Sequence, residues 1–480
     1  MKSVRYLVFM LLGASFNSIS QAAEITNQML VKVKENNASE KWSEQKTTLL
    51  EHLQGFMPAP VLLDSYGGRT DRKEKATGFF YTKQSDSGWV FVDPEGCHTF
   101  SMGVCSTSPY DDVADHKEAF AKTFSDNTDW AKKTHAQLVG DLRFNSLGCW
   151  SDWKTFKKAR TNVPYVLRWN LMASYAKKKS VTHEEYGHTG FKDDVLPVFD
   201  KEFVKHCDEV CKEMAETRED PWLIGHFSDN ELPFTSKGIL KRYLKAPPKD
   251  ESHLAAALFV KKNGIKEDAI SDANDIEFTG LVLRTYYKTV HDAIRKHDPN
   301  HLILGSRLHG KASNQDVCYT ASGPFVDVVS INYYHRWTPV QDELNRRAEL
   351  ARKPILITEF YAKSDETGLN NSKGAGFTVQ TQKDRGRFYE NFTIGLLKNR
   401  NVVGWHWFRY IDDGDLKTKG FSSNKGIVNV QYQEYRELAA SMKAINSAVY
   451  QLSDFLRVPL VNPSHKKQEG SNRPGAGDGK

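Results

Sequence analysis

Short apolar runs alternate with longer amphipathic segments over most of the chain. The segments 203–214 and 281–294 repeat apolar residues at helical spacing, and the second is expected to end at His297-Asp-Pro-Asn300. The apolar runs between such segments have the length of strands that are buried on both faces. Eight of these runs lie at residues 100–104, 146–149, 165–169, 223–227, 302–305, 326–332, 355–358 and 402–407.

Eight buried strands separated by helices predict an α/β fold, a (β/α)8 TIM barrel. A doubly wound sheet would need a glycine-rich turn after its first strand, and Phe100-Ser-Met-Gly-Val104 contains no such turn. We therefore expect residues 96–458 to form one barrel. In such a barrel the catalytic groups lie at the carboxyl ends of the strands.

The segments on either side of the barrel have a different pattern. Residues 24–75 are polar and helix-prone, with an apolar stripe at Leu49, Leu50 and Leu53. Two apolar runs at 78–81 and 89–92 flank a turn-rich segment, which predicts a β-hairpin. We expect residues 24–95 to form a short N-terminal extension of helix and hairpin, and the polar residues 459–480 to be a disordered tail.

The amino end has the features of a secretory signal peptide. Lys2 and Arg5 form a basic region, residues 6–16 are apolar, and small residues before position 24 offer a cleavage site. The apolar stretch is too short to span a bilayer, and no cysteine stands at the cleavage point to carry a lipid. The pattern predicts removal of residues 1–23 and an exported protein, periplasmic or secreted, without a membrane anchor.

Charge and cysteine content narrow the possibilities further. The 480 residues carry 66 Lys and Arg against 60 Asp and Glu, a net charge of +6 without a basic block, so nothing indicates nucleic-acid binding. Six cysteines are present, and a domain of this size does not need disulfide bonds for stability. We expect buried thiols, with a Cys97–Cys318 bridge left open.

Two glutamates stand where catalytic groups are expected. Glu231 follows the fourth apolar run within Asp229-Asn230-Glu231, and Glu359 ends the otherwise uncharged seventh run. Cleavage of a glycosidic bond needs two carboxyl groups, one as acid and one as nucleophile or base, and a separation of about 5 Å is typical of retaining enzymes. Asn230 is a candidate to bind a sugar hydroxyl, and Tyr334 a candidate to donate a hydrogen bond to a carboxylate.

In combination, these motifs resemble a clan A retaining glycoside hydrolase, most closely the β-agarase family numbered fifty and its relatives. The resemblance rests on Asp229-Asn-Glu231, Ser330-Ile-Asn-Tyr-Tyr334, Thr358-Glu359-Phe and Gly404-Trp-His-Trp407. It implies that Glu231 is the acid/base, Glu359 the nucleophile, Tyr334 the partner that orients the nucleophile, and Asn230 the ligand of the sugar 2-hydroxyl. It also implies that Trp405 or Trp407 forms the floor of the −1 subsite.

Further residues near the strand ends are candidates for substrate binding. Asn332 and His335 lie in or next to the sixth-strand motif. Trp150 and Trp169 could stack on sugar rings or pack between barrel and helices. Arg168, Arg307, Arg336 and Arg409 could bind a sulfate or carboxylate on the sugar, with Arg307 as the first choice, or form salt bridges to Asp229, Asp412 or Asp413.

Other chemistries lack motif support. His183 and His188 are five residues apart with a glycine between them, which does not fit a zinc-binding H-E-x-x-H helix. The sequence has no G-x-S-x-G, Walker or C-x-x-C motif, and we expect no metal and no cofactor. The expected partner is an agar-like polysaccharide or its oligosaccharides. Porphyran, carrageenan, other β-galactosides and a barrel that binds without cleaving remain alternatives, and the oligomeric state is open.

Overall fold

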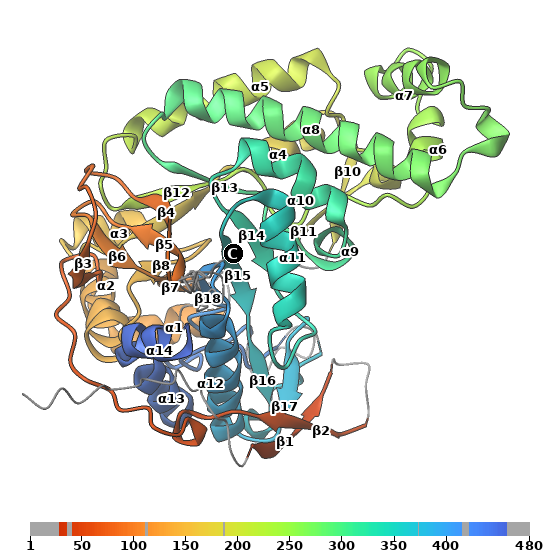
Figure 1. Cartoon of the computed structure of the whole chain (residues 1–480). Helices are drawn as coiled ribbons and strands as arrows, with labels where there is room; N and C mark the ends of the chain where they lie inside the picture. The colour runs from red at the N-terminus through yellow and green to blue at the C-terminus, as the bar shows by residue number, and fades with distance from the viewer. Residues whose placement is uncertain are drawn as a thin grey trace, which may run out of the picture.

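The computed structural model describes residues 28–35, 41–110, 114–185, 188–372, 374–414 and 422–457. The predicted signal peptide and the predicted tail lie outside the described residues. An eight-stranded parallel sheet forms the centre of the molecule (Figure 1), which confirms the predicted (β/α)8 barrel. Its strands are β7 Ser101–Val104, β8 Ser146–Leu147, β9 Tyr165–Arg168, β12 Leu223–Phe227, β13 Leu302–Gly305, β14 Val329–Asn332, β15 Ile355–Phe360 and β18 Val402–Trp407.

The sheet runs in the order β13-β12-β9-β8-β7-β18-β15-β14, and its end strands β13 and β14 lie against each other, so the barrel is nearly closed. All neighbouring strands are parallel. Between the first and last strands, the backbone amides of Asp327 and Val328 donate to the Ile303 carbonyl at 2.9 and 3.3 Å. Each of the eight predicted apolar runs is a barrel strand, because parallel strands covered by helices are apolar on both faces.

Helices surround the sheet and connect its strands. The amphipathic segment 203–214 begins in α5, and 281–294 lies within α8, which ends at His297 as predicted. These two helices pack side by side along one edge of the molecule, and α6 and α7 project beyond it (Figure 1). The helices are α1 Ala114–Thr123, α2 Asn127–His135, α3 Trp153–Lys158, α4 Leu171–Lys178, α5 Lys201–Cys211, α6 Ile239–Leu244, α7 Glu251–Lys262, α8 Asp272–His297, α9 Gly310–Ser313, α10 Asp316–Ser322, α11 Gln341–Ala351, α12 Gln382–Lys398, α13 Arg436–Ser447 and α14 Val449–Leu456.

The N-terminal extension differs from the prediction. The predicted hairpin forms between β4 Tyr81–Ser85 and β5 Gly88–Val92, in a four-stranded sheet with β3 Arg69–Lys73 and β6 Cys97–Thr99. In the described residues of 24–75, which are 28–35 and 41–75, the expected helix does not form. That segment contains strands β1 Met29–Lys34 and β2 Ser43–Thr47, and its apolar stripe forms only a 3-10 turn at Leu50–His52.

Long-range pairing explains the difference. β1 pairs with β17 Phe377–Val379, which in turn pairs with β16 Ala362–Ser364, so two chain segments more than 300 residues apart share one sheet. Val31 and Val33 are buried on one face of β1. Partners that lie so far along the chain are not visible in local helix propensity.

Two further predictions concern thiols and membranes. All six cysteines, Cys97 and Cys318 included, are buried free thiols, which confirms the expectation of structural thiols. Within the described residues, no helix combines the length and apolar character that crossing a membrane requires.

The carboxyl ends of six successive barrel strands share a backbone feature. In each case a residue other than glycine takes a left-handed conformation, at Ser106, Trp150, Asn170, Glu231, Arg307 and His335, with φ between 50° and 61°. Such residues are uncommon, and they tend to occur where a surrounding structure holds them for function. Three of them, Trp150, Glu231 and Arg307, take part in the site described below.

Candidate active site

Glu231 and Glu359 lie at the same end of the barrel. Glu231 comes four residues after β12, and Glu359 is the fifth of the six residues of β15. The register pairs Asn332, the last residue of β14, with Glu359. The Glu359 side chain is 7% exposed and that of Glu231 is 11% exposed. The barrel mouth thus contains two largely buried carboxyl groups.

Both oxygens of Glu359 accept hydrogen bonds, one from the buried Arg307 and one from the partly buried Tyr334. Arg307 Nη2 donates to Oε1 at 2.5 Å, and the Tyr334 hydroxyl donates to Oε2 at 2.6 Å. Burial raises the pKa of Glu359 above its usual value, the Arg307 guanidinium and the Tyr334 hydroxyl act against this rise, and the Glu231 charge adds to it. Burial also raises the pKa of Tyr334 well above its usual range, so its hydroxyl stays a donor. Glu359 is therefore oriented through both of its oxygens.

Glu231 is held differently. Asn332 Nδ2 donates to Glu231 Oε1 at 2.6 Å, and the side-chain oxygen Oδ1 of Asn332 accepts from Thr358 Oγ1 at 2.7 Å. Because Thr358 precedes Glu359 in β15, the Asn332 side-chain amide connects Glu231 to the strand that carries Glu359. The second oxygen of Glu231 faces Nδ1 of His188 at 3.5 Å. This oxygen is therefore not held by a short hydrogen bond from the barrel.

A cavity of about 540 Å³ opens beside Glu231. Its lining includes His188, from the hairpin formed by β10 Thr182–Glu185 and β11 His188–Phe191, and His309, which lies just before α9. The Nδ1 atom of His309 is 3.9 Å from Glu231 Oε1. Glu231 consequently faces a space that can hold the part of a ligand beyond the two carboxyl groups.

The two residues before Glu231, Asp229 and Asn230, hold the segment that follows β12 in place. Asn230 Oδ1 accepts from Arg307 Nη1 at 2.7 Å, which leaves its amide group as a donor. Asp229 is fully buried and accepts from the backbone amides of Met172 and Ala173, at the start of α4, and from the Tyr286 hydroxyl. Burial raises the pKa of Asp229 to about 6. Asp229 thus ties β12 to α4 and α8, and Asn230 and Glu231 project from a fixed point.

Arg307 does not have the predicted role. It is fully buried, and its guanidinium is used by Glu359, by Asn230 and by the Thr358 carbonyl at 3.1 Å. The prediction that Arg307 is the arginine most suited to an anionic sugar is therefore wrong. The alternative prediction, a salt bridge, is correct for Arg307. Its partner, however, is Glu359 and not Asp229, Asp412 or Asp413.

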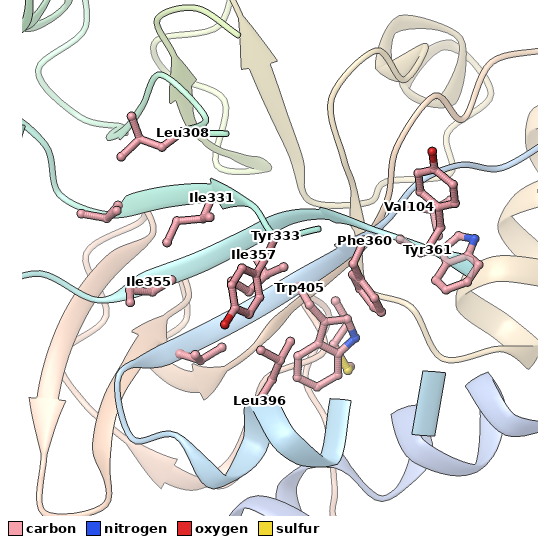
Figure 2. Packing of buried hydrophobic residues seen from close by; sticks show 14 of the residues in the cluster. Val104, Leu308, Ile331, Tyr333, Ile355, Ile357, Phe360, Tyr361, Leu396 and Trp405 are labelled. Atoms are coloured by element: carbon pink, nitrogen blue, oxygen red, sulfur yellow. The ribbon is translucent and has the colours of Figure 1, made fainter. Parts of the chain in front are cut away.

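Trp405 and Trp407 are not where the prediction places them. Both are 0% exposed: the Trp405 indole donates to the Tyr389 hydroxyl and the Trp407 indole to the Lys425 carbonyl, each at 3.0 Å. Figure 2 shows the Trp405 ring next to Leu396 of α12, in the packing between strand and helix. Rings enclosed in this way cannot stack on a sugar, so the predicted −1 floor is wrong for both.

Phe408, the next residue along the chain, is an aromatic side chain that keeps part of its surface accessible beside Trp150. Its ring is partly exposed and lies 5.9 Å from Trp150 and 5.9 Å from Tyr361, centroid to centroid. Trp150 is also partly exposed, and its ring lies 4.3 Å from the Arg307 guanidinium carbon. Trp150 therefore contacts Arg307, and its binding of substrate stays a prediction.

Two other candidates lie differently. The Trp169 indole donates to His226 Nδ1 at 2.9 Å, and its ring packs partly against the core, which favours the packing role. His335 directly follows Tyr334; it is exposed, and its backbone takes a left-handed conformation. Neither residue has a contact that joins it to the glutamates among the described residues.

Sequence reasoning missed His188, His309 and Phe408. The signal for His188 was visible in the pair His183 and His188, but their spacing was tested only against a helical zinc site. The two residues instead lie on opposite strands of a hairpin that brings His188 to Glu231. Phe408 follows the eighth apolar run and could have been found by extending that run by one residue.

Two side-chain groups elsewhere have the composition of a metal site. In one, His226, Asp298 and His301 lie together, and every imidazole nitrogen already has a protein hydrogen-bond partner. The other consists of Asp64, Asp93 and Cys97, where burial and the neighbouring Asp64 raise the pKa of Asp93 to about 8. Neither group touches the two glutamates.

Comparisons with known proteins give the following relatives. No protein-family profile matches the chain. It is 25% identical to Beta-agarase B of Vibrio sp. (strain JT0107) over 491 residues, which covers 81% of this chain and 50% of the relative. It is 26% identical to Beta-agarase A of the same organism, covering 75% of this chain and 46% of the relative. The chain thus spans about half the length of the curated relatives it matches.

Solved structures match over a larger share of their length. The crystal structure of BpGH50 superimposes with a TM-score of 0.79 at 30% identity and covers 89% of this chain and 96% of that one. The structure of an exo-beta-agarase superimposes with a TM-score of 0.69 at 21% identity and covers 84% of this chain and 69% of that one. At this identity the likeness shows a shared fold alone.

Proposed function

The chain belongs to glycoside hydrolase family 50, and from that premise we propose that it hydrolyses β-linked, galactose-containing polysaccharides of the agar type, or their oligosaccharides, by a retaining mechanism. The observation that carries the proposal is the pair Glu231 and Glu359 in one barrel mouth, with surroundings that differ. A glycosidase needs one carboxyl group that holds a proton and one that is ionised, and different surroundings produce that difference.

Glu359 is proposed as the nucleophile. Its carboxylate attacks the anomeric carbon and forms a glycosyl-enzyme ester. Arg307 and Tyr334 favour the ionised form, since both donate to the carboxylate, and they fix the direction of its oxygens.

Glu231 is proposed as the acid/base. In the first step it gives its proton to the leaving oxygen, and in the second it takes a proton from the water that cleaves the ester. Its Oε2, which faces the cavity and has no short bond from the barrel, is the oxygen suited to this exchange. Asn332 holds the other oxygen, and the Asn230 amide is placed to donate to the sugar 2-hydroxyl.

The substrate part of the proposal rests on the relatives. Both curated relatives are named beta-agarases, and the chain covers about half of each. Reducing-sugar release should therefore be measured over neutral agarose, porphyran, carrageenan and plant β-galactans. We expect the highest rate on an agar-type galactan. Release only from another galactan would change the substrate and keep the mechanism.

A barrel that binds polysaccharide without cleaving it is the second candidate. Both glutamates are present, Glu359 with a donor on each oxygen and Glu231 with a donor on one, which favours the enzyme, since a barrel that had lost catalysis would be free to replace either of them. Binding without release from any polysaccharide of the panel would favour the second candidate.

The nucleophile is tested by chemical rescue. Glu359→Ala should abolish turnover, and added azide should restore product formation as an α-glycosyl azide, because the small anion enters the space left by the carboxylate and attacks from that face. The matched variant Glu231→Ala should instead give a β-glycosyl azide, and only with an activated leaving group, because azide then displaces Glu359 from the glycosyl-enzyme ester. Proton NMR of the first product, recorded before mutarotation, should show the β anomer, and an α product would rule out retention.

Export to the periplasm or the medium also remains our proposal. It rests on the basic, apolar and small-residue regions of positions 1–23, which lie outside the described residues. Amino-terminal sequencing of the protein from the native host, after fractionation, should find a start near residue 24. A retained Met1 in the cytoplasmic fraction would refute it.

A further inference from the structure

The structure separates the four arginines that the sequence places at the barrel rim. Arg307 is paired with Glu359 at 2.5 Å, Arg336 with Glu343 at 2.7 Å, and Arg409 with Asp413. Arg168 has no carboxylate partner among the described residues. Its one side-chain hydrogen bond goes to the neutral carbonyl oxygen of Asn170.

Arg168 belongs to the wall of the proposed active site. It is the last residue of β9, and its guanidinium carbon lies 4.9 Å from the centre of the Trp150 ring. The Arg307 guanidinium lies 4.3 Å from the same ring and contacts Glu359. Arg168, Trp150, Arg307 and Glu359 thus form one continuous series of contacts.

The nearest carboxylates do not neutralise Arg168. Asp229 and Glu359 act on its charge, but Asp229 is hydrogen-bonded to α4 and to Tyr286, and Glu359 to Arg307 and Tyr334. Burial lowers the pKa of Arg168, and the like charge of Arg307 lowers it further. A guanidinium that is mostly removed from water without a counter-ion is unfavourable unless another group compensates its charge.

The remaining donors of Arg168 face a partly exposed position. Both Arg168 and Trp150 keep part of their surface accessible, and no nitrogen of Arg168 is buried without a partner. A guanidinium offers five N–H groups in a planar fork that matches the two oxygens of a sulfate ester or a carboxylate. An aromatic ring beside it can stack on the apolar face of a pyranose.

We propose that Arg168 and Trp150 form a subsite for a galactose unit that carries an anionic substituent, a sulfate ester or a carboxylate. The ring of that unit lies beside the exposed part of Trp150, and its anionic oxygens accept from Arg168. The inference deepens the proposed function and rests on it, since it assigns a charged galactan to the site already described. Arg307, which the sequence favoured for this role, instead orients the nucleophile.

The test measures binding, so that it does not depend on turnover. Calorimetry with Glu359→Gln protein would compare three oligosaccharides of equal length: a neutral agar oligosaccharide, one with a sulfate ester and one with a carboxylate substituent. We expect at least one anionic oligosaccharide to bind more tightly than the neutral one. The additional change Arg168→Gln should weaken its binding about tenfold or more, since charged hydrogen bonds are lost, with little effect on the neutral ligand.

Two further variants control the result. Arg168→Lys keeps the charge and removes the fork, and should retain part of the preference. Arg336→Gln removes a rim arginine that already has a carboxylate partner, and should retain all of it. Thermal unfolding of each variant shows whether it is folded. Equal binding of neutral and anionic ligands by the Glu359→Gln protein would overturn the proposal. So would an Arg168→Gln or Arg168→Lys change that weakens the binding of neutral and anionic ligands to the same extent.

The outcomes separate this proposal from the proposed function. Hydrolysis of neutral agarose by the unmodified protein, without any preference for anionic ligands, would reject the anionic subsite and keep the enzyme. An Arg168-dependent preference in a protein that cleaves no galactan would keep the subsite and reject the enzyme.

Discussion

The two sides of the barrel mouth support their glutamates by different means. On the Glu359 side, Arg307 after β13 and Tyr334 after β14 saturate both carboxylate oxygens from within the barrel framework. On the Glu231 side, Asn332 holds one oxygen, and the other faces His188 on a two-stranded hairpin and a cavity. A nucleophile must keep one direction, whereas an acid must exchange a proton with a leaving group and with water. The difference in support matches that difference in task.

Exchanging the carboxylates is the strongest way to test this comparison. Glu359→Gln should lower kcat by roughly four orders of magnitude or more on every substrate, because the nucleophile is lost. Glu231→Gln should cause a comparable loss on a polysaccharide but a much smaller one on an aryl glycoside with an activated leaving group, which needs no proton. Steady-state kinetics on both substrate types checks this. Equal losses of Glu231→Gln on both types would contradict the assignment of the acid.

Removing one support of Glu359 should give an intermediate effect with a defined pH signature. Tyr334→Phe deletes a hydrogen bond that favours the ionised carboxylate, so the pKa of Glu359 rises further. Since the nucleophile must be ionised, the acidic limb of the kcat/KM profile should move to higher pH, by about one unit, with a loss of roughly tenfold to a hundredfold at the optimum.

The matched control is Tyr333→Phe, on the preceding residue, whose hydroxyl contacts Glu343 instead of Glu359. Its pH profile should keep the acidic limb in place. A shift of the Tyr334→Phe limb to lower pH, or no shift at all, would show that Tyr334 does not support the ionised form of Glu359.

Removing His188 should give the smallest effect, and it should alter only the proton transfer by Glu231. His188→Gln deletes the group that faces Glu231 Oε2 at 3.5 Å and that also contacts Glu185 at 2.6 Å. Because His188 faces Glu231 and has no hydrogen bond or ion pair with Glu359 in the described part of the chain, we expect a loss of about threefold to tenfold on polysaccharide and almost none on an activated aryl glycoside. His183→Gln changes an exposed histidine of the same hairpin and is the control. Equal losses on both substrates would place His188 outside the proton-transfer step.

Much of the fold was predictable because it depends on short, local patterns. The eight buried strands are apolar on both faces, so they stand out against helices with a 3.6-residue period. The same reading failed for residues 24–75, where β1 needs β17 as its partner, and no local pattern records a partner that lies more than 300 residues away.

The predictions for the site divide by a similar principle. Glu231, Glu359, Tyr334, Asn230 and Asn332 come together as expected, because strand ends in a parallel barrel meet at one face. The fine roles of these residues await the experiments above. Trp405 and Trp407 were misplaced because β18 is buried on both faces, and apolar character then does not tell which side chain faces the barrel and which faces α12.

The sequence by itself determined the barrel, the strands that carry the two glutamates and the tyrosine beside one of them, because each depends on composition and spacing within a few residues. Only the tertiary structure decided which arginine is paired and which is not, which aromatic side chain borders the site, and that a hairpin histidine reaches the second glutamate. Those outcomes depend on the direction of side chains and on contacts between segments far apart in the chain. Alternation along a strand shows that two faces exist, and only packing assigns a neighbour to each face.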